Sequence, residues 1–153
     1  MKNWVYTILG YLLILSVIIL VFKLYKWHAI IEIDATDHTM EPDYKYGGHT
    51  LDISAQRVDQ LTQGSAVAFY LPGNSVRPKV AYVVAIEGQR VAVRTGKVFV
   101  NEHPFEPPLY GLSEEVPEYV VPRGCAVLMA RYVGEDSTKH GPIPMRNIWG
   151  RLK

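Results

Sequence analysis

The sequence predicts an all-β protein, with an antiparallel β body behind one N-terminal transmembrane helix. Residues 5–22 form an uncharged apolar run, whereas the rest of the 153-residue chain repeats short segments rich in Val, Ile, Tyr and Phe. Turn residues separate those segments, and helical periodicity is almost absent after residue 29. A body of roughly 125 residues is large enough to bury one hydrophobic core, so we expect one β domain.

The apolar run Val5–Phe22 is long enough to cross a bilayer. As a helix, its 18 residues would span roughly 27 Å, which is close to the thickness of the hydrocarbon core. A cleaved signal sequence would have a shorter apolar stretch followed by small residues, whereas the bulky, basic segment Lys23–Trp27 follows here. We therefore expect a retained membrane anchor over residues 1–28 and a β domain over residues 29–153. Aromatic residues suited to membrane interfaces flank the run: Trp4, Tyr6, Tyr25 and Trp27.

The charge distribution argues against binding to nucleic acid. All 15 acidic residues lie from Glu32 onward, against 13 Lys and Arg residues, so the body carries about −2. A nucleic-acid-binding domain normally has a basic patch or stripe. Cys125 is the only cysteine, which excludes an intrachain disulfide and any multi-cysteine metal site. We expect no cofactor. The lysines on the two sides of the anchor are too evenly balanced to set its orientation.

The body has the pattern of a series of short strands. Arg90–Arg94 and Lys97–Asn101 are separated only by Thr95-Gly96, which predicts a tight antiparallel hairpin. The segment Glu102–Pro117 contains four prolines, so we expect an irregular surface excursion between strands. The other predicted strands are Ala29–Ile33, Thr50–Ile53, Ala66–Leu71, Val80–Ile86, Glu118–Val121 and Ala126–Tyr132.

A series of motifs, taken in order, resembles the type I signal peptidase family. Thr39-Met40-Glu41-Pro42 stands where the family has S-M-x-P, and Gly64–Pro72 is similar to the family's G-D-I-V-x-F-x-x-P strand. Further similar segments are Gly47–Leu51, Val83–Val91, Gly96–Asn101, Val121–Gly124, Asp136-Ser137, Gly141–Pro144 and Ile148–Arg151. The resemblance covers the chain from the anchor to the C-terminus. It implies a signal-peptidase-type β body and a single-pass protein of the bacterial inner membrane, with the body on the periplasmic side.

The residues that carry catalysis in that family are altered here. The family uses a Ser nucleophile whose proton is taken by a neutral, desolvated Lys, but Thr39 holds the nucleophile position. Counting back from Gly88, the general-base position falls on Ala81. Lys79 lies two residues earlier, roughly 6.6 Å along the strand, so it could replace the base only through a register slip or a bulge. The family's supporting G-D-N segment is replaced by Leu128–Arg131.

Other chemistries have less support in the sequence. One branch of the family uses a histidine base, but none of the five histidines occupies that position, and His38 would point away from Thr39 in an extended segment. Asp37, His38 and Glu41 are metal-ligand types, yet their spacing matches no metal motif, so we predict no metal site. Cys125 has the character of a buried structural cysteine.

A peptide-binding groove can be retained in a protein that has lost catalytic activity. In the family the substrate adds as an extended strand beside the site, and the resemblance places Met40, Pro42 and Phe69 along that groove. We therefore predict a membrane-anchored protein that has lost catalysis and is an accessory or structural subunit of a membrane or secretion-related complex. Its predicted partners are membrane lipid and either a membrane protein complex or an extended peptide. The alternative is an active signal peptidase that cleaves exported preproteins through Thr39 and an unidentified base.

Overall fold

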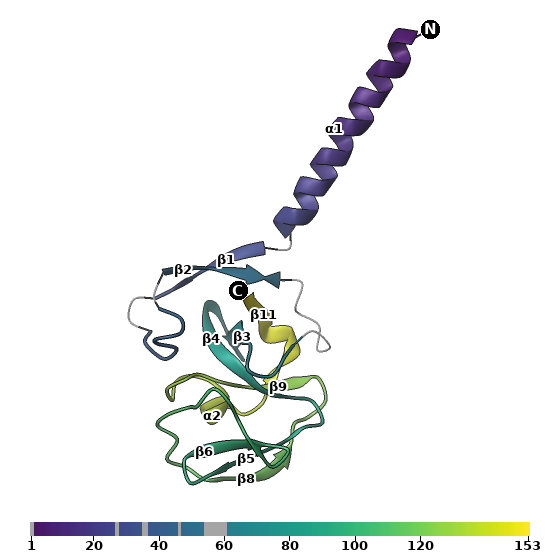
Figure 1. Ribbon diagram of the computed structural model, residues 1–153. Coiled ribbons are helices and arrows are strands. Elements are labelled where there is room, and N and C mark those ends of the chain that lie inside the picture. Colours follow the sequence, from purple (N-terminus) through teal and green to yellow (C-terminus); the bar gives the residue numbers. More distant parts are fainter. Residues whose placement is uncertain (1, 27, 35–36, 46, 54–60) are drawn as a thin grey trace.

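The computed structural model describes residues 2–26, 28–34, 37–45, 47–53 and 61–153. A long N-terminal helix leads into a β body of two antiparallel sheets, and the smaller sheet lies at the end farthest from the helix (Figure 1). The all-β, antiparallel body that we predicted is therefore confirmed. In chain order the elements are α1 (Lys2–Lys26), β1 (His28–Ile33), β2 (Gly47–Asp52), β3 (Ala66–Leu71), β4 (Asn74–Ile86), β5 (Arg90–Arg94), β6 (Lys97–Val100), β7 (His103–Pro104), β8 (Val116–Val120), β9 (Cys125–Met129), α2 (Ser137–His140), β10 (Ile143–Pro144), η3 (Met145–Asn147) and β11 (Ile148–Leu152).

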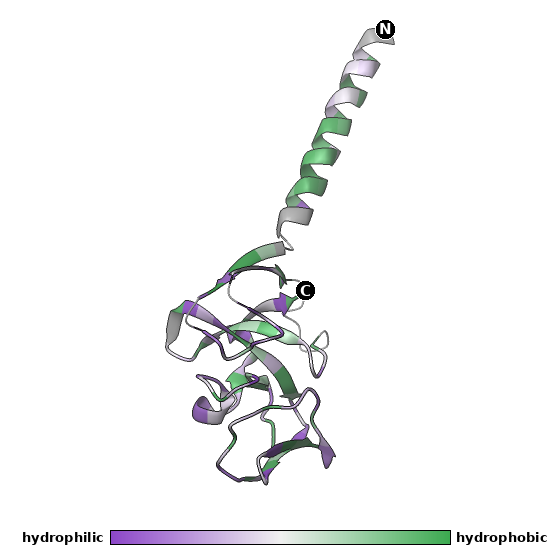
Figure 2. Ribbon diagram, turned by 60° about the vertical axis from the view of Figure 1, so that its left-hand side comes forward, coloured by the Kyte–Doolittle hydropathy of each residue, from purple (hydrophilic) through white to green (hydrophobic). Residues whose placement is uncertain are grey.

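Helix α1 includes the apolar run Val5–Phe22 and extends it at both ends, whereas His28, which was predicted to belong to the anchor, is the first residue of β1. Its stretch Trp4–Lys23 has a mean hydropathy of 2.7, and none of it is buried against the rest of the protein. These 20 residues span about 30 Å as a helix. The half of α1 nearer the β body is the more hydrophobic part in Figure 2, and the helix as a whole is long and apolar enough to cross a membrane. Met1 and Trp27 of the predicted anchor lie outside the described residues.

The larger sheet has seven strands in the order β1-β2-β11-β3-β4-β9-β10, and neighbouring strands are antiparallel. Strand β3 has the predicted bounds, whereas β4 begins at Asn74, six residues before its predicted start. Strands β10 and β11 were missed. The sequence of β11 is Ile-Trp-Gly-Arg-Leu, and its central Gly150 weakens the strand pattern although β11 inserts between β2 and β3.

The smaller sheet has the order β7-β6-β5-β8. Strands β5 and β6 pair in antiparallel register as the predicted hairpin. The two turn residues, Thr95 and Gly96, have φ values of 49° and 72°, which are the left-handed values that a two-residue type I′ turn requires. Gly96 adopts its value without strain, whereas Thr95 is a β-branched residue that rarely does. The two-residue turn leaves Arg94 paired with Lys97. The hairpin prediction is confirmed.

The segment Glu102–Pro117 is more regular than its prolines suggested. It contains β7 and the first two residues of β8. Both strands are at the edges of their sheet, where a proline that lacks an N–H donor is tolerated. Phe105 and Leu109 are buried in the core. The prediction of an irregular surface excursion is therefore wrong for these parts, because the segment also covers apolar space between the sheets.

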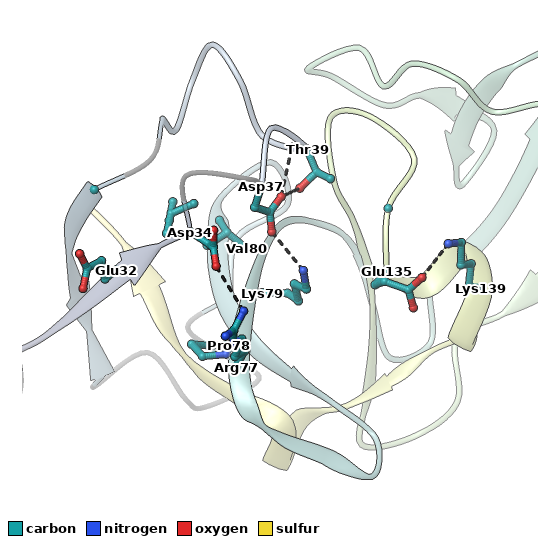
Figure 3. Close-up of a pocket in the computed structure, with 13 residues that line it drawn as sticks. Glu32, Asp34, Asp37, Thr39, Arg77, Pro78, Lys79, Val80, Glu135 and Lys139 are labelled. Carbon is teal, nitrogen blue, oxygen red and sulfur yellow. Dashed lines mark hydrogen bonds and ion pairs between the residues drawn. The ribbon is translucent and has the colours of Figure 1, made fainter.

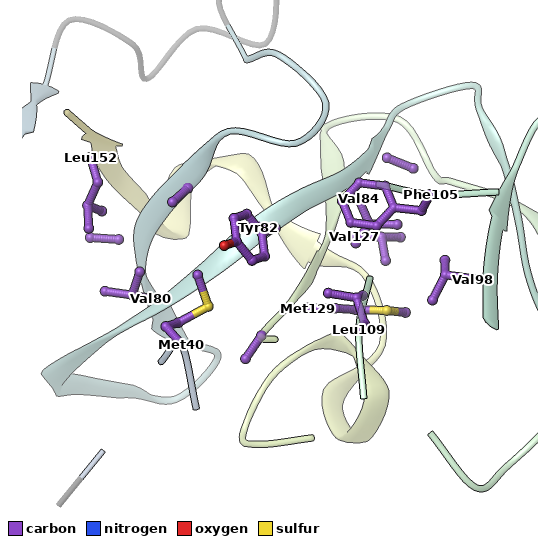
Figure 4. Packing of buried hydrophobic residues seen from close by; sticks show 14 of the residues in the cluster. Met40, Val80, Tyr82, Val84, Val98, Phe105, Leu109, Val127, Met129 and Leu152 are labelled. Atoms are coloured by element: carbon purple, nitrogen blue, oxygen red, sulfur yellow. The ribbon is translucent and has the colours of Figure 1, made fainter. Parts of the chain in front are cut away.

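Strand β4 separates two groups of buried side chains, because alternate residues of a strand point to opposite faces. Val80 and Tyr82 belong to the larger cluster, which lies between the two sheets and includes Met40 (Figure 4). Ala81 and Val83 belong to a smaller cluster on the other face. Strand β4 is therefore buried on both faces over these residues.

Substitution of Gly150 tests the close approach of β11 to β2. A Cβ atom at Gly150 would lie 2.9 Å from the carbonyl oxygen of Asp52 and 3.2 Å from the Cα of Ile53. Because both atoms are backbone, the strands would have to separate, and we expect Gly150→Ala to destabilise the protein by about 1–3 kcal/mol. Urea unfolding in mild detergent measures the change. Gly48→Ala is the matched control, since its Cβ would meet only the Ile30 side chain at 3.6 Å; equal midpoints for both variants would contradict the packing described here.

Candidate functional site

A cavity of about 640 Å³ opens beside Thr39 (Figure 3). Its walls come from the end of β1, the segment 37–39, the first half of β4 and the turn that leads into α2. Thr39 and Lys79, which the sequence analysis singled out, both line it, so we take it as the candidate site. The complete lining is Glu32, Ile33, Asp34, Asp37, Thr39, Gly47, Arg77, Pro78, Lys79, Val80, Gly134, Glu135 and Lys139.

Asp37 connects the two predicted site residues. Its Oδ1 accepts hydrogen bonds from the Thr39 hydroxyl at 2.6 Å and from the Thr39 backbone N–H at 3.2 Å. Its Oδ2 accepts from Lys79 Nζ at 3.2 Å, as Figure 3 shows. The carboxylate therefore lies between the hydroxyl and the ammonium group. The sequence analysis considered Asp37 only as a metal ligand; the signal it missed is the D-x-T spacing, which is typical of a side-chain-capped turn.

The position of Thr39 is set by its neighbours on both sides. Its carbonyl oxygen accepts a hydrogen bond of 2.9 Å from the backbone N–H of Tyr132. The next residue, Met40, is 2% exposed and is packed in the larger core cluster. On the other side, a Cβ atom at Gly134 would lie only 3.0 Å from the Thr39 methyl group. The Thr39 methyl group thus has room because residue 134 is a glycine and has no side chain.

Lys79 reaches the cavity, whereas Ala81 does not. The pairing of β3 with β4 is regular from Ala66 to Phe69, which is opposite Lys79, and its register then shifts before Leu71. The shift lies beyond Lys79, between the Phe69–Lys79 and Leu71–Asn74 pairs, so it does not change the position of Lys79 relative to Ala81. Ala81 is fully buried in the smaller core cluster, on the opposite face of β4 from Val80 and Tyr82. The structure places Thr39 and Lys79 on one cavity, which Ala81 does not line.

The charged groups that line the cavity are mostly paired. Arg77 pairs with Asp34 at 3.3 Å, and Lys139 pairs with Glu135 at 2.7 Å. Glu135 also contacts His140, and these hydrogen bonds, with the one from Lys139 foremost, lower the pKa of Glu135 to about 2. These pairs lie at the rim and are well exposed, so each contributes little to stability.

A second network holds the Thr39 segment against the sheet. The carboxylate of Asp43 accepts from both the Tyr82 hydroxyl and Arg131 Nη1. The Arg131 guanidinium also lies 5.7 Å from the centre of the Tyr110 ring, which stacks on Tyr132. Burial, followed by the bond to Asp43, raises the pKa of Tyr82. Arg131 belongs to the segment that replaces the family's G-D-N, so this network provides a support that sequence reasoning did not find.

Asp136 and Ser137, which match the family's motif, support the end of β9. Asp136 Oδ2 accepts from the backbone N–H of Ala130 at 2.8 Å, and Ser137 Oγ accepts from the N–H of Leu128 at 2.9 Å. Asp136 Oδ1 accepts from both the N–H and the hydroxyl of Thr138, at 2.8 and 2.6 Å. Burial raises the pKa of Asp136 even though these bonds oppose the change.

The residues predicted to line a peptide groove have different environments. Phe69 is 0% exposed in the smaller core cluster, and Met40 is buried in the larger one. Neither side chain is available to line an open groove in this structure. Pro42 is exposed and lines a shallow depression with His38, Thr39, Glu41 and Tyr132.

The histidine alternative has no geometric support at the site. His38 Nδ1 is 3.0 Å from Glu41 Oε1, and both side chains face solvent in part. No histidine lines the cavity among the residues that the structure describes. A Thr–His pair is therefore not formed here.

The pKa of Asp37 reflects its two partners. Burial of the carboxylate disfavours its charge, but the hydrogen bonds from Thr39 and the charge and hydrogen bond of Lys79 outweigh this effect and lower the pKa below its ordinary value. The ionised carboxylate is thus the stable form near neutral pH. Such a group is a weak proton acceptor.

The lowered pKa of Asp37 predicts a pH dependence of stability. A carboxyl group whose folded-state pKa is depressed stabilises the fold above its unfolded pKa, and that contribution is lost as pH falls through the folded value. We expect the unfolding midpoint of the wild type to fall more steeply below about pH 5 than that of Asp37→Asn. Urea unfolding at several pH values measures this difference. Glu115→Gln, which removes an exposed carboxylate, is the control and should follow the wild type; a parallel Asp37→Asn curve would contradict the ion pair.

A family model and one relative agree with the resemblance seen in the sequence. The thylakoidal processing peptidase 1, chloroplastic, of Arabidopsis thaliana is 40% identical over 73 residues, a match that covers 45% of this chain and 22% of that protein's length. Among solved structures, a signal peptidase I from Enterococcus faecalis V583 has a TM-score of 0.49 and 15% identity, over 60% of this chain and 96% of that chain. A family model described as signal peptidase, peptidase S26, matches residues 1–153, and the chain therefore belongs to the signal peptidase family.

Proposed function

We propose that this protein is a membrane-anchored member of the signal peptidase family that does not hydrolyse peptide bonds. In this proposal it is an accessory or structural subunit of a membrane or secretion-related complex. The observation that carries the proposal is the state of Thr39, whose hydroxyl donates to a carboxylate that is already ion-paired with Lys79. The residue at the family's base position, Ala81, is buried and has no group that accepts a proton.

The arrangement lacks a suitable base for Thr39. A hydroxyl becomes a strong nucleophile only when a neighbouring group accepts its proton. An amine accepts a proton only in its neutral form, but Lys79 Nζ is engaged in an ion pair with the Asp37 carboxylate at 3.2 Å. Asp37 itself is a weak base because its pKa is lowered. Neither neighbour therefore activates Thr39 in this state.

The same local arrangement occurs elsewhere in the chain with a structural role. Asp136 accepts from the backbone N–H and the hydroxyl of Thr138, just as Asp37 accepts from those of Thr39. The Asp136 turn caps the short helix α2. A D-x-T turn thus forms this pair of hydrogen bonds at a site where it caps a helix. This favours a structural role for the hydrogen bond of the Thr39 hydroxyl.

The surface around Thr39 remains suited to a ligand. The cavity is open to solvent and contains both apolar and charged walls, and it adjoins the depression lined by Pro42 and Tyr132. An extended peptide needs only such walls and free backbone groups, and not a nucleophile. Because a similar protein is named a processing peptidase, an extended peptide or a membrane protein complex is the class of partner that we propose.

A second candidate function is an active peptidase that acts through Thr39. The observation that favours it is the contact of a hydroxyl, a carboxylate and an amine within one cavity, which is the kind of geometry that nucleophilic catalysis requires. In that case Asp37 and Lys79 would have to exchange a proton with Thr39 when a substrate binds.

Cleavage of a preprotein distinguishes the two functions. We expect the purified full-length protein to cut no faster than its Thr39→Ala variant, since loss of one member of a nucleophile–base pair can lower turnover on the order of 10⁶-fold. Both proteins should still bind a peptide from the cleavage region, measured by fluorescence anisotropy. An active signal peptidase of the same family is the positive control. Cutting by the wild type but not by Thr39→Ala would establish the second function instead.

We also propose that the protein is a single-pass protein of the bacterial inner membrane, with its body on the periplasmic side. The anchor-like helix α1 and the family support this placement. A Cys125→Ser, Glu115→Cys variant carries one thiol at an exposed position of the body. We expect a small membrane-impermeant maleimide to label it in spheroplasts, with Cys125→Ser as the unlabelled control. Labelling that requires permeabilisation would place the body in the cytoplasm.

A further inference from the structure

A second cavity, of about 580 Å³, is lined by the smaller sheet, the end of β9, the segment 111–114 and helix α2; we call it the inter-sheet cavity. Among the described residues, its lining and that of the Thr39 cavity share only Lys139, so the two spaces are distinct. Figure 1 shows α2 and the smaller sheet in the half of the body away from α1. The complete lining is Val91, Val93, Gly111, Leu112, Ser113, Glu114, Val116, Tyr119, Pro122, Met129, Val133, Ser137, Thr138, Lys139, Gly141 and Pro142.

The inner wall of the inter-sheet cavity is apolar and reaches the core. Val91, Val93 and Met129 line it, yet they are only 1%, 2% and 4% exposed and belong to the larger core cluster. An engineered protein cavity of about 150 Å³ already binds benzene. A space of about 580 Å³ is therefore larger than one apolar side chain requires, and it lies in the range of about 300–1,000 Å³ that is typical of small-molecule sites.

Tyr119 lines the inter-sheet cavity, and its hydroxyl has no partner. Burial raises the pKa of this hydroxyl, and burial is the only cause of the change. The hydroxyl forms no hydrogen bond within the part of the chain that the structure describes. A phenol oxygen can accept a hydrogen bond, and the face of an aromatic ring attracts a cation. Tyr119 is thus able to contact an ammonium group.

The charges along the inter-sheet cavity also favour a cation. The charged residues of its lining are Lys139 and Glu114. Lys139 Nζ is 2.7 Å from Glu135 Oε1, so its charge is already balanced. Glu114 is exposed, and its carboxylate forms no ion pair with any residue that the structure describes. An unpaired negative charge therefore lies at the edge of an apolar cavity.

We propose that the inter-sheet cavity binds a small apolar amine. The apolar body of this ligand lies against Val91, Val93 and Met129, and its ammonium group pairs with Glu114 and contacts Tyr119. A bilayer lipid is less suited to the cavity, which lies in the half of the body away from α1 (Figure 1). The site is independent of the proposed function, because it occupies a different cavity.

Three naphthalene derivatives of similar size test the proposal. Naphthylmethylamine is a cation at neutral pH, naphthylmethanol is uncharged, and naphthoate is an anion. The full-length protein in phosphatidylcholine nanodiscs is titrated with each probe by isothermal titration calorimetry, and empty nanodiscs give the contribution of the lipid. We expect the protein to bind the amine about fivefold more tightly than the alcohol, which is the upper range for an ion pair open to solvent. The anion should bind more weakly than the alcohol.

Variants of the lining locate the bound probe. Glu114→Gln should lower the affinity for the amine about fivefold and leave the affinity for the alcohol unchanged. Glu115→Gln is the matched control and should have no effect, because Glu115 is also exposed but does not line the cavity. Leu112→Trp fills part of the cavity and should weaken binding of both probes. If thermal unfolding shows that Leu112→Trp is not folded, Ser113→Trp, at an exposed position of the lining, takes its place.

Several results would overturn the proposal. They are absence of binding for all three probes, an amine that binds no more tightly than the alcohol, and an affinity for the amine that does not respond to Glu114→Gln. Binding that is unchanged in a folded Trp variant would place the probe elsewhere and would also overturn it. So would a phospholipid that native mass spectrometry finds on the wild type but not on the Trp variant, since the occupant would then be a lipid. None of these results bears on Thr39, whose role preprotein cleavage tests separately.

Discussion

Strand β4 pairs with β3 along one edge and with β9 along the other, and most of the structure depends on it. Its side chains alternate between two buried clusters, so each position on β4 is committed to one face. Ala81 faces the smaller cluster among closely packed apolar groups, where a charged amine would be costly to bury. Lys79, opposite Phe69, is at the end of the regular pairing with β3, and its side chain lines the Thr39 cavity.

The parts of the fold that were predicted correctly depend on residues that are close together in the sequence. The hairpin around Thr95-Gly96 follows from two turn residues, and α1 follows from one uncharged run. Strand β11 was missed because its pairing with β2 and β3 comes from opposite halves of the chain, and because Gly150 interrupts its pattern. A side chain at position 150 would clash with the backbone of Asp52, which explains the glycine there. This contact becomes visible only when the pairing of β11 with β2 is known.

The candidate site was only partly predictable for the same reason. Thr39 was found because it stands in a recognisable motif, and Lys79 was considered because of its place on a strand. Asp37 was not recognised as their link, since its contact with Lys79 spans 42 positions in the sequence. The bond between Arg131 and Asp43 spans 88 positions, and a replacement for the lost G-D-N segment cannot be read from the residues that replace it.

The connection between α1 and the β body is short, which limits how far the cavity can lie from the helix. Helix α1 ends at Lys26 and β1 begins at His28, so a single residue joins the anchor to the body. Glu32, Ile33 and Asp34 line the cavity at the other end of β1. At about 3.3 Å per residue, the six steps along the chain from His28 to Asp34 extend roughly 20 Å. Whatever the tilt of the helix, the cavity therefore lies within about this distance of the membrane end of α1. The partner class proposed above, a membrane protein or a peptide held at the membrane, is compatible with a cavity at this distance from the end of α1.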